Sequence, residues 1–311
     1  MTKNLKPIDQ QVVAITGASS GIGLATALLA AKRGATVALI ARSEKTLQKI
    51  AAHIAVDGGH ALAIKADVGN RTEISNAVHA ILQAHGRIDT WVNNAGVSIY
   101  GRLDEVDDPD SKRMFETNFW GVVNGSLAAL PFLRRQGGAL INVGSEASDA
   151  AIPLQGMYSA SKHAVKGFTD ALRIELDADD AGVSVTLIQP TAVDTPFPEH
   201  AGSYLSLEPK LPTPMIDPTK VAEAILDAAV RPTRHARVGA MAVVNTTVAR
   251  LAPHLADSLA KLQIGRQQRQ EAPHDLRGTL YEPSESGRVH GRGNERAADF
   301  AVARESNVRP D

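Results

Sequence analysis

The sequence contains no cysteine. This absence excludes disulfide bonds, thiolate metal ligands and a cysteine nucleophile. The ten histidines are scattered, without an HExxH or comparable spacing, so we expect no metal site. There is also no run of about eighteen apolar residues, and the first ten residues lack the apolar stretch of a signal peptide. These absences predict a soluble cytoplasmic protein.

The sequence also lacks an excess of charge of either sign. The chain has 33 Lys and Arg residues against 34 Asp and Glu residues, and no long basic run. This balance argues against a nucleic-acid partner. What is present is a 43% share of hydrophobic residues in a chain of 311. That is enough for a sizeable core, and we expect one α/β domain with an appendage.

Short apolar runs alternate with helical patterns along the first 245 residues. The expected strands lie at residues 12–16, 36–41, 61–67, 88–92, 138–145, 183–189 and 236–244. Long helical stretches are expected at residues 107–135 and at about 155–177. This alternation predicts a Rossmann-type, doubly wound, seven-stranded parallel sheet with helices on both faces.

Three glycines, Gly17, Gly21 and Gly23, separate the first strand from the first helix. They permit a tight turn and let the backbone approach a pyrophosphate, which the N–H groups and positive end of the helix attract. A plain structural turn could have the same composition, but the strand before and the helix after are the context that the motif requires. We therefore predict a dinucleotide-binding turn.

The second strand ends at Arg42 and Ser43, where a dinucleotide fold meets the adenosine ribose. An acidic residue there would bind the 2′-hydroxyl and repel a phosphate, whereas a guanidinium suits a phosphate through its planar donor fork. The pair therefore favours NADP(H) over NAD(H). The alternative is that Arg42 caps the strand and Ser43 begins the next helix, and both residues could do this while binding phosphate.

Ser145, Tyr158 and Lys162 are the candidate catalytic residues. Tyr158 and Lys162 are four residues apart, which places them on one face of a helix. A cation in a partly dry cleft stabilises a phenolate and so favours movement of the phenol's proton. Ser145 ends a buried strand, at the edge where open α/β sheets bind ligands. A Tyr and Lys at this spacing also occur on ordinary helix surfaces.

Ser145, the YSASK segment from Tyr158 to Lys162, the TGxxxGxG turn and an NNAG segment at residues 93–96 resemble the classical branch of the short-chain dehydrogenase/reductase (SDR) family. The resemblance covers roughly residues 9–245. It implies an NADP(H)-dependent oxidoreductase that acts on a carbonyl or secondary alcohol, with Tyr158 as acid or base, Ser145 orienting the oxygen, and Lys162 lowering the pKa of Tyr158 and binding the nicotinamide ribose. Besides the glycines, Arg42, Ser43, Tyr158 and Lys162, it implies cofactor contacts from Ser19, Ser20, Ile22, Asp67, Val68, Asn94, Ala95, Gly96, Pro190, Thr191, Val193 and Thr195.

Asn118 lies in the long helical stretch, and its amide must find partners if it is buried. The resemblance implies that it holds a local break in this helix and completes a proton relay from Lys162. Thr191 stands where the family has a glycine, so its backbone must avoid the left-handed region.

We expect a catalytic domain at residues 1–245, with a proline-rich substrate lid at about 191–218, and a C-terminal extension at 246–311. The extension begins with Leu251, Leu255, Leu259 and Leu262 on one helical face, which we expect to pack on this subunit or a partner. Its polar face has few basic residues, which argues against membrane binding. After residue 265 it is polar, and disorder and an arm across a neighbouring subunit are both open. The short patch Leu280-Tyr281-Glu282-Pro283 forms a candidate anchor.

Two other functions fit the same sequence. One is a non-catalytic NADP(H)-binding sensor, and the other is a structural subunit. The resemblance implies a homodimer or homotetramer in which the two long helices pair across an interface, and a small-molecule substrate.

Overall fold

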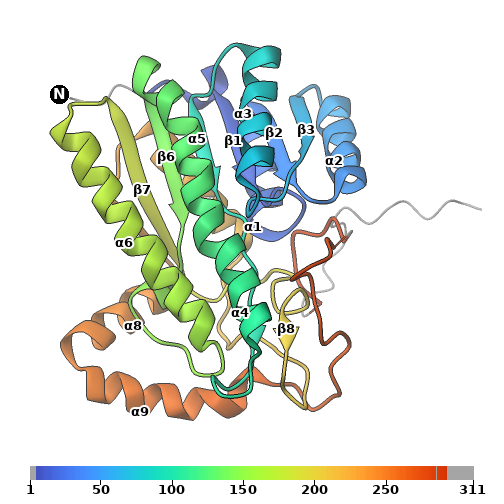
Figure 1. The fold of residues 1–311 in the computed structure, drawn as a ribbon, viewed down its shortest axis with the longest axis vertical. Coiled ribbons are helices and arrows are strands. Elements are labelled where there is room, and N and C mark those ends of the chain that lie inside the picture. The colour runs from blue at the N-terminus through green and yellow to red at the C-terminus, as the bar shows by residue number, and fades with distance from the viewer. Residues whose placement is uncertain (1–4, 285, 293–311) are drawn as a thin grey trace, which may run out of the picture.

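The computed structural model describes residues 5–284 and 286–292. Its central sheet has seven parallel strands in the order β3-β2-β1-β4-β6-β7-β9 (Figure 1). The strands are β1 (Val12–Thr16), β2 (Thr36–Ala41), β3 (His60–Lys65), β4 (Thr90–Asn93), β6 (Gly138–Val143), β7 (Val183–Pro190) and β9 (His235–Val238). The predicted seven-stranded, doubly wound parallel sheet is therefore confirmed.

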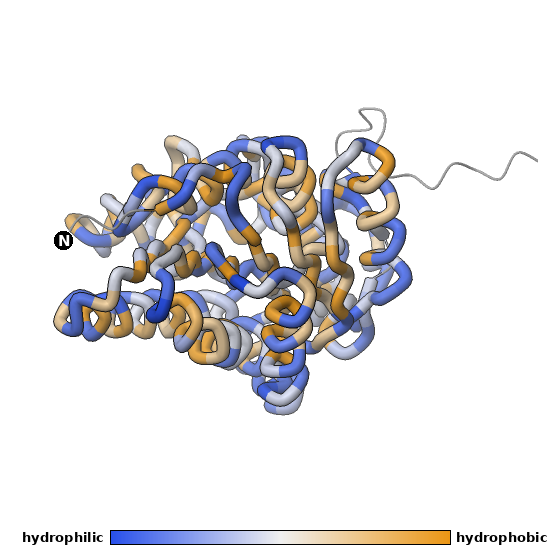
Figure 2. The backbone as a smooth tube through the Cα atoms, turned by 90° about the horizontal axis from the view of Figure 1, so that it is seen from above, coloured by the Kyte–Doolittle hydropathy of each residue, from blue (hydrophilic) through white to orange (hydrophobic). Residues whose placement is uncertain are grey.

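Helices cover both faces of the sheet. The described helices are α1 (Gly21–Lys32), α2 (Glu44–Val56), α3 (Arg71–His85), α4 (Asp108–Phe115), α5 (Gly121–Gln136), α6 (Gly156–Ala178), α7 (Pro218–Val230), α8 (Ala240–Leu251) and α9 (Pro253–Gln263), of which α8 and α9 lie beyond the ends of the strands (Figure 1). One hydrophobic core joins the sheet to α1, α2 and α7, and a second joins it to α3, α5 and α6. Along the outer helices, hydrophobic residues alternate with hydrophilic ones, as one-sided packing requires (Figure 2).

Strand β1 shows how the sheet divides these cores. Val13 and Ile15 belong to the core under α1 and α7, whereas Val12 and Ala14 belong to the core under α3 and α5. Because successive side chains of a strand point to opposite faces, a sheet covered on both sides needs apolar residues at every position. All five residues of β1 are buried.

The last strand was predicted too long. The sequence pattern indicated a strand over residues 236–244, but β9 ends at Val238 and α8 begins at Ala240. Gly239, with φ of 95°, occupies the left-handed side of backbone space and turns the chain from strand to helix. The residues after it, Ala-Met-Ala, are good helix formers.

The leucines of the extension lie on two helices. Leu251 ends α8, and Leu255, Leu259 and Leu262 belong to α9. Their side chains are 76%, 54%, 47% and 69% exposed, respectively, so these leucines are not buried on this subunit. Contact with a partner subunit stays a prediction.

A buried chain of amides crosses the middle of the sheet. Asn93 of β4 donates to the side-chain oxygen of Asn142 of β6 at 2.8 Å, and to the Ser126 hydroxyl at 3.0 Å. Asn142 donates in turn to the Thr169 hydroxyl of α6 at 2.9 Å. All four side chains are buried. These bonds fix two central strands and two helices relative to one another.

We expect Asn142→Leu to lower the free energy of unfolding by about 2–3 kcal/mol, because it removes two buried hydrogen bonds and leaves one amide proton of Asn93 without an acceptor. Urea unfolding measures this. Asn76→Leu makes the same change at an exposed position on α3 and should shift stability by less than about 0.5 kcal/mol. Equal losses in both variants would contradict a structural role for the network.

Candidate active site

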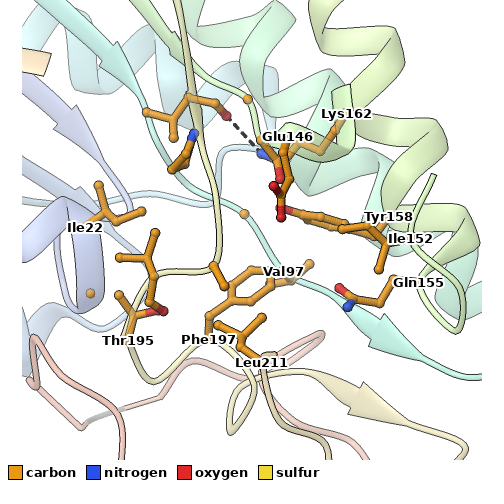
Figure 3. Close-up of a pocket in the computed structure, with 18 of the residues that line it drawn as sticks. Ile22, Val97, Glu146, Ile152, Gln155, Tyr158, Lys162, Thr195, Phe197 and Leu211 are labelled. Atoms are coloured by element: carbon orange, nitrogen blue, oxygen red, sulfur yellow. Dashed lines mark hydrogen bonds between the residues drawn. The ribbon is translucent and has the colours of Figure 1, made fainter. Parts of the chain in front are cut away.

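Helix α6 carries two of the three predicted catalytic side chains. Tyr158 and Lys162 lie in its first two turns, and both are buried at the edge of a cavity (Figure 3). The Lys162 ammonium lies 5.7 Å from the centroid of the Tyr158 ring and donates to the carbonyl oxygen of Val143 at 2.9 Å. Ser145 follows β6 and lines the same cavity. The structure therefore brings all three residues together.

Burial dominates the ionisation of these groups. It raises the pKa of Tyr158 to about 12, an effect that the charge of Glu146 reinforces and a hydrogen bond with Ser145 opposes. Burial likewise lowers the pKa of Lys162 to about 8. The resemblance implied that Lys162 lowers the pKa of Tyr158, but here desolvation outweighs any such effect. A protonated phenol is the form that can donate a proton to a carbonyl oxygen.

The cavity has a volume of about 550 Å³ and runs from the glycine turn to Tyr158. Figure 3 shows Ile22 and Thr195 on one side of it and Tyr158 and Gln155 on the other. Nearly all the predicted cofactor and catalytic residues line it: Gly17, Ser19, Ser20, Gly21, Ile22, Arg42, Ser43, Asp67, Val68, Asn94, Ala95, Gly96, Ser145, Tyr158, Lys162, Pro190, Thr191, Val193 and Thr195. Gly23 and Asn118 are the two predicted site residues that do not.

Gly23 is required for close packing instead. A Cβ atom there would lie 2.1 Å from the carbonyl oxygen of Gly17 and 2.5 Å from the side-chain nitrogen of Asn94. That nitrogen donates to the carbonyl oxygens of Thr16 at 3.0 Å and of Gly17 at 3.3 Å. The NNAG segment therefore holds the glycine turn against the end of β4. The turn itself keeps room for the backbone to approach a pyrophosphate group.

Asn118 supports the site from behind. It lies in a π-helical turn, Glu116–Trp120, between α4 and α5, so the single long helix expected at residues 107–135 is interrupted there. Its side chain accepts from the Val97 N–H at 2.8 Å and donates to the Val97 carbonyl at 2.9 Å. It also donates to the Ser161 hydroxyl at 3.1 Å. Asn118 thereby ties the chain after β4 to the helix that carries Tyr158.

Arg42 lies at the predicted place, but its donors are in use. The guanidinium hydrogen-bonds to four consecutive carbonyl oxygens of the C-terminal extension, those of residues 279–282. Arg113, which also pairs with Asp67, donates to the carbonyl oxygen of Leu280 at 3.1 Å. A 2′-phosphate would therefore have to replace these carbonyls as the acceptor, or join them.

The extension forms a wall of the cavity that sequence reasoning did not place there. Thr279, Pro283 and Ser284 line the cavity, and Leu280 is fully buried against the cluster that includes Tyr158. Further along, the carbonyl oxygen of Arg288 accepts from the Gly21 N–H at 2.9 Å, at the start of α1. The apolar pair Leu280 and Tyr281 was the available signal. Residues 293–311 lie outside the described part of the chain.

Glu146 also belongs to the site, although no sequence motif indicated it. It follows Ser145, is buried, and lines the cavity. One carboxylate oxygen accepts from the Thr191 hydroxyl at 3.1 Å and from the Asn245 side chain of α8 at 2.9 Å. Thr191 has no positive φ, as expected for a residue that replaces glycine. A charged residue directly after a buried strand was the signal that could have identified Glu146.

The predicted lid contributes to the apolar part of the cavity. Phe197, Leu211 and Pro212 line it, and the Phe197 ring packs edge-on against the Tyr158 ring with centroids 5.6 Å apart. Val244 of α8 and Leu259 of α9 line it as well. Within residues 5–284 and 286–292, no helix has the length and apolar character needed to span a membrane. Nor do His, Asp and Glu side chains in this part of the chain gather into a group of three that could hold a metal ion.

Comparisons with known proteins identify the family of this chain. Residues 11–203 match the family described as short chain dehydrogenase. YxnA of Bacillus subtilis (strain 168), an uncharacterized oxidoreductase, is 44% identical over 276 residues, which cover 88% of this chain and 78% of YxnA. The chain belongs to the short-chain dehydrogenase family and is an oxidoreductase.

Two solved structures are similar in fold. An alcohol dehydrogenase from Thermococcus sibiricus in complex with 5-hydroxy-NADP has a TM-score of 0.65 at 30% identity, covering 73% of this chain and 94% of that chain. A short-chain dehydrogenase/reductase from Burkholderia phymatum in complex with NAD has a TM-score of 0.73 at 25% identity, covering 81% and 96%. The first of these structures thus holds an NADP derivative and the second holds NAD.

The buried amine makes a testable contribution to stability. Because the pKa of Lys162 is about 8 in the folded protein and 10.5 ordinarily, the unfolded chain binds more protons between these values, and stability rises with pH there. We expect the free energy of unfolding of the wild type to rise by about 2 kcal/mol relative to Lys162→Met between about pH 8 and 10. Chemical unfolding of both proteins at several pH values checks this, and a constant difference would contradict the burial argument.

Proposed function

We propose that this protein is an NADP(H)-dependent carbonyl reductase or secondary-alcohol dehydrogenase. The observation that carries the proposal is the meeting of Ser145, Tyr158 and Lys162 in one cavity with the glycine turn. A nicotinamide held in this cavity would supply or accept the hydride. The protein's task is then to orient the substrate oxygen, to exclude water, and to move one proton.

Each side chain has a distinct part in this reaction. The Ser145 hydroxyl hydrogen-bonds the substrate oxygen and orients it. Tyr158 donates its proton to that oxygen in reduction and removes it in oxidation. Lys162 holds a positive charge behind the ring and lies among the residues that would hold the nicotinamide ribose. Asn118 keeps α6 in place through Ser161, and the proton relay suggested for it remains a prediction.

Two features support NADP(H) as the preferred cofactor. The residues at the end of β2 are Arg42 and Ser43, with no acid where the 2′-hydroxyl would be bound. Arg42 also lines the cavity and makes its hydrogen bonds with neutral carbonyl oxygens. A phosphate dianion is a stronger acceptor for a guanidinium than a carbonyl is, so it can compete for these donors.

The cytoplasmic location, the homodimer or homotetramer, and the domain and lid boundaries remain predictions. So does the assignment of cofactor contacts to individual residues.

We expect Tyr158→Phe to lower the turnover number by at least about a hundredfold, because general acid catalysis contributes that much or more. NADPH binding, followed by fluorescence titration, should change by less than about threefold, since the ring remains. An unchanged turnover number would remove Tyr158 from the mechanism. Failure of the wild type to bind either dinucleotide would instead favour the structural-subunit function, and binding without turnover of any ketone would favour the sensor.

For the cofactor, we expect Arg42→Ala to weaken NADPH binding about tenfold or more, because it removes a charge-assisted hydrogen bond to the 2′-phosphate. NADH is the internal control. Arg42 also holds the C-terminal extension, and loosening of that wall would weaken both dinucleotides together. The test is therefore the ratio of the two dissociation constants, and an unchanged ratio would contradict the proposed phosphate contact.

A further inference from the structure

Glu146 is a buried acid that the proposed reaction does not use. Its side chain lies beside Tyr158 and Lys162 at the cavity (Figure 3). One oxygen, Oε2, is held by the Thr191 hydroxyl and the Asn245 amide, both neutral donors. For the other oxygen, Oε1, the described residues provide no hydrogen-bond donor. The carboxylate is thus anchored at one oxygen and available at the other.

Among the described residues, no basic side chain forms an ion pair with this carboxylate. Four basic side chains line the cavity, and each has another hydrogen-bond partner, which for His200 is the Ser286 hydroxyl: Arg42, Lys162, His163 and His200. Arg42 binds the extension, Lys162 donates to the Val143 carbonyl, and the His163 ring contacts the Ser159 carbonyl. Burial without a positive partner raises the pKa of Glu146. An uncompensated buried acid gains when a ligand brings a cation or a donor to it.

The surroundings narrow the class of ligand. Beyond Tyr158, the cavity wall is largely apolar and includes Ile152, Phe197, Leu211, Val244 and Leu259. The charge of Glu146 acts on the Tyr158 phenol, whose pKa it helps to raise, so the carboxylate lies close to the proton donor. A ligand that fills this space has an apolar body and meets Glu146 close to its reacting carbon.

We propose that Glu146 is a specificity-determining residue. It selects apolar ketones, or the matching secondary alcohols, that carry an ammonium group on the carbon adjacent to the reacting carbon. This inference rests on the proposed function and names its substrate class. The ammonium donates to the available carboxylate oxygen, while Ser145 and Tyr158 contact the carbonyl oxygen. Asn245 and Thr191 act as positioning residues, because they hold the carboxylate from behind.

The test uses three ketones with the same hexyl chain: methyl hexyl ketone and the two analogues in which a dimethylaminomethyl or a hydroxymethyl group replaces its methyl group. The readout is kcat/KM with NADPH for each. The ammonium group also activates the carbonyl by withdrawing electrons, so the preference is compared between the wild type and Glu146→Gln. Intrinsic reactivity cancels in this comparison.

We expect the preference for the aminoketone over methyl hexyl ketone to fall about tenfold or more in Glu146→Gln, as loss of a charge-assisted hydrogen bond implies. Glu146→Asp, which keeps the charge, should retain part of the preference. Asp149→Asn is the matched control. Asp149 also lines the cavity, but Lys166 at 3.6 Å and Gln189 at 2.6 Å already pair with it. Its removal should change the preference by less than about twofold.

Several outcomes would overturn the inference. One is the same preference in Glu146→Gln as in the wild type, and another is an equal loss in Asp149→Asn. A third is a wild type that prefers the hydroxymethyl ketone as strongly as the aminoketone, with both preferences lost in Glu146→Gln. This result would show that Glu146 recognises a neutral donor and not a cation. Thermal melting and NADPH titration verify that each variant is folded.

The wild type alone separates this inference from the proposed function. Reduction of methyl hexyl ketone, without competitive inhibition by hexyldimethylamine, would leave the proposed function intact and overturn the role of Glu146. No turnover of any of the three ketones with NADPH or NADH would overturn both.

Discussion

The hydrogen bond between the Lys162 ammonium and the Val143 carbonyl is the contact on which the site depends. It joins the first turns of α6 to the end of β6 at a distance of 2.9 Å. A buried amine must find an acceptor, because leaving it unpaired in a low-dielectric interior would be costly. Since Ser145 lies two residues beyond Val143 and Tyr158 one helical turn before Lys162, this one contact sets the positions of all three.

Buried amides extend the same constraint through the molecule. Asn93 and Asn142 join the two central strands, and Asn118 joins the chain after β4 to α6. Each makes at least two hydrogen bonds in a buried environment, so a shift of one element relative to another would leave several polar groups unpaired. The sheet's apolar faces provide most of the stability, whereas these amides determine how the elements are aligned at the carboxyl ends of the strands.

Much of this arrangement could be predicted from the sequence because local patterns encode it. The period of the apolar residues predicted the seven strands, and the four-residue spacing of Tyr158 and Lys162 predicted a shared helix face. The interruption near Asn118 came from the family resemblance, since a buried amide alone does not predict a π-helical turn. The predicted end of β9 was wrong because apolar residues 240–244 suit a strand and a helix equally. Gly239, with its positive φ, decides between them.

Other features could not be predicted from the sequence because they depend on contacts between distant residues. The contacts of Arg42 involve main-chain carbonyls 237 to 240 residues away, and carbonyl groups leave no signature in a sequence. The orientation of Glu146 depends on Thr191 and Asn245, which the fold brings together from separate elements. The pKa of Tyr158 depends on burial, which no motif reports. These are long-range properties of the folded chain.

The contact between Arg42 and residues 279–282 has a consequence for biosynthesis. The glycine turn and β2 are translated before the segment that closes the cleft over them, which lies 237 to 240 residues after Arg42. A nascent chain can assemble its central sheet before this segment emerges, but its cleft stays open on one side until then. Premature termination after α9 would thus yield a protein with an intact sheet and an intact α6 whose cavity is open to water on one side.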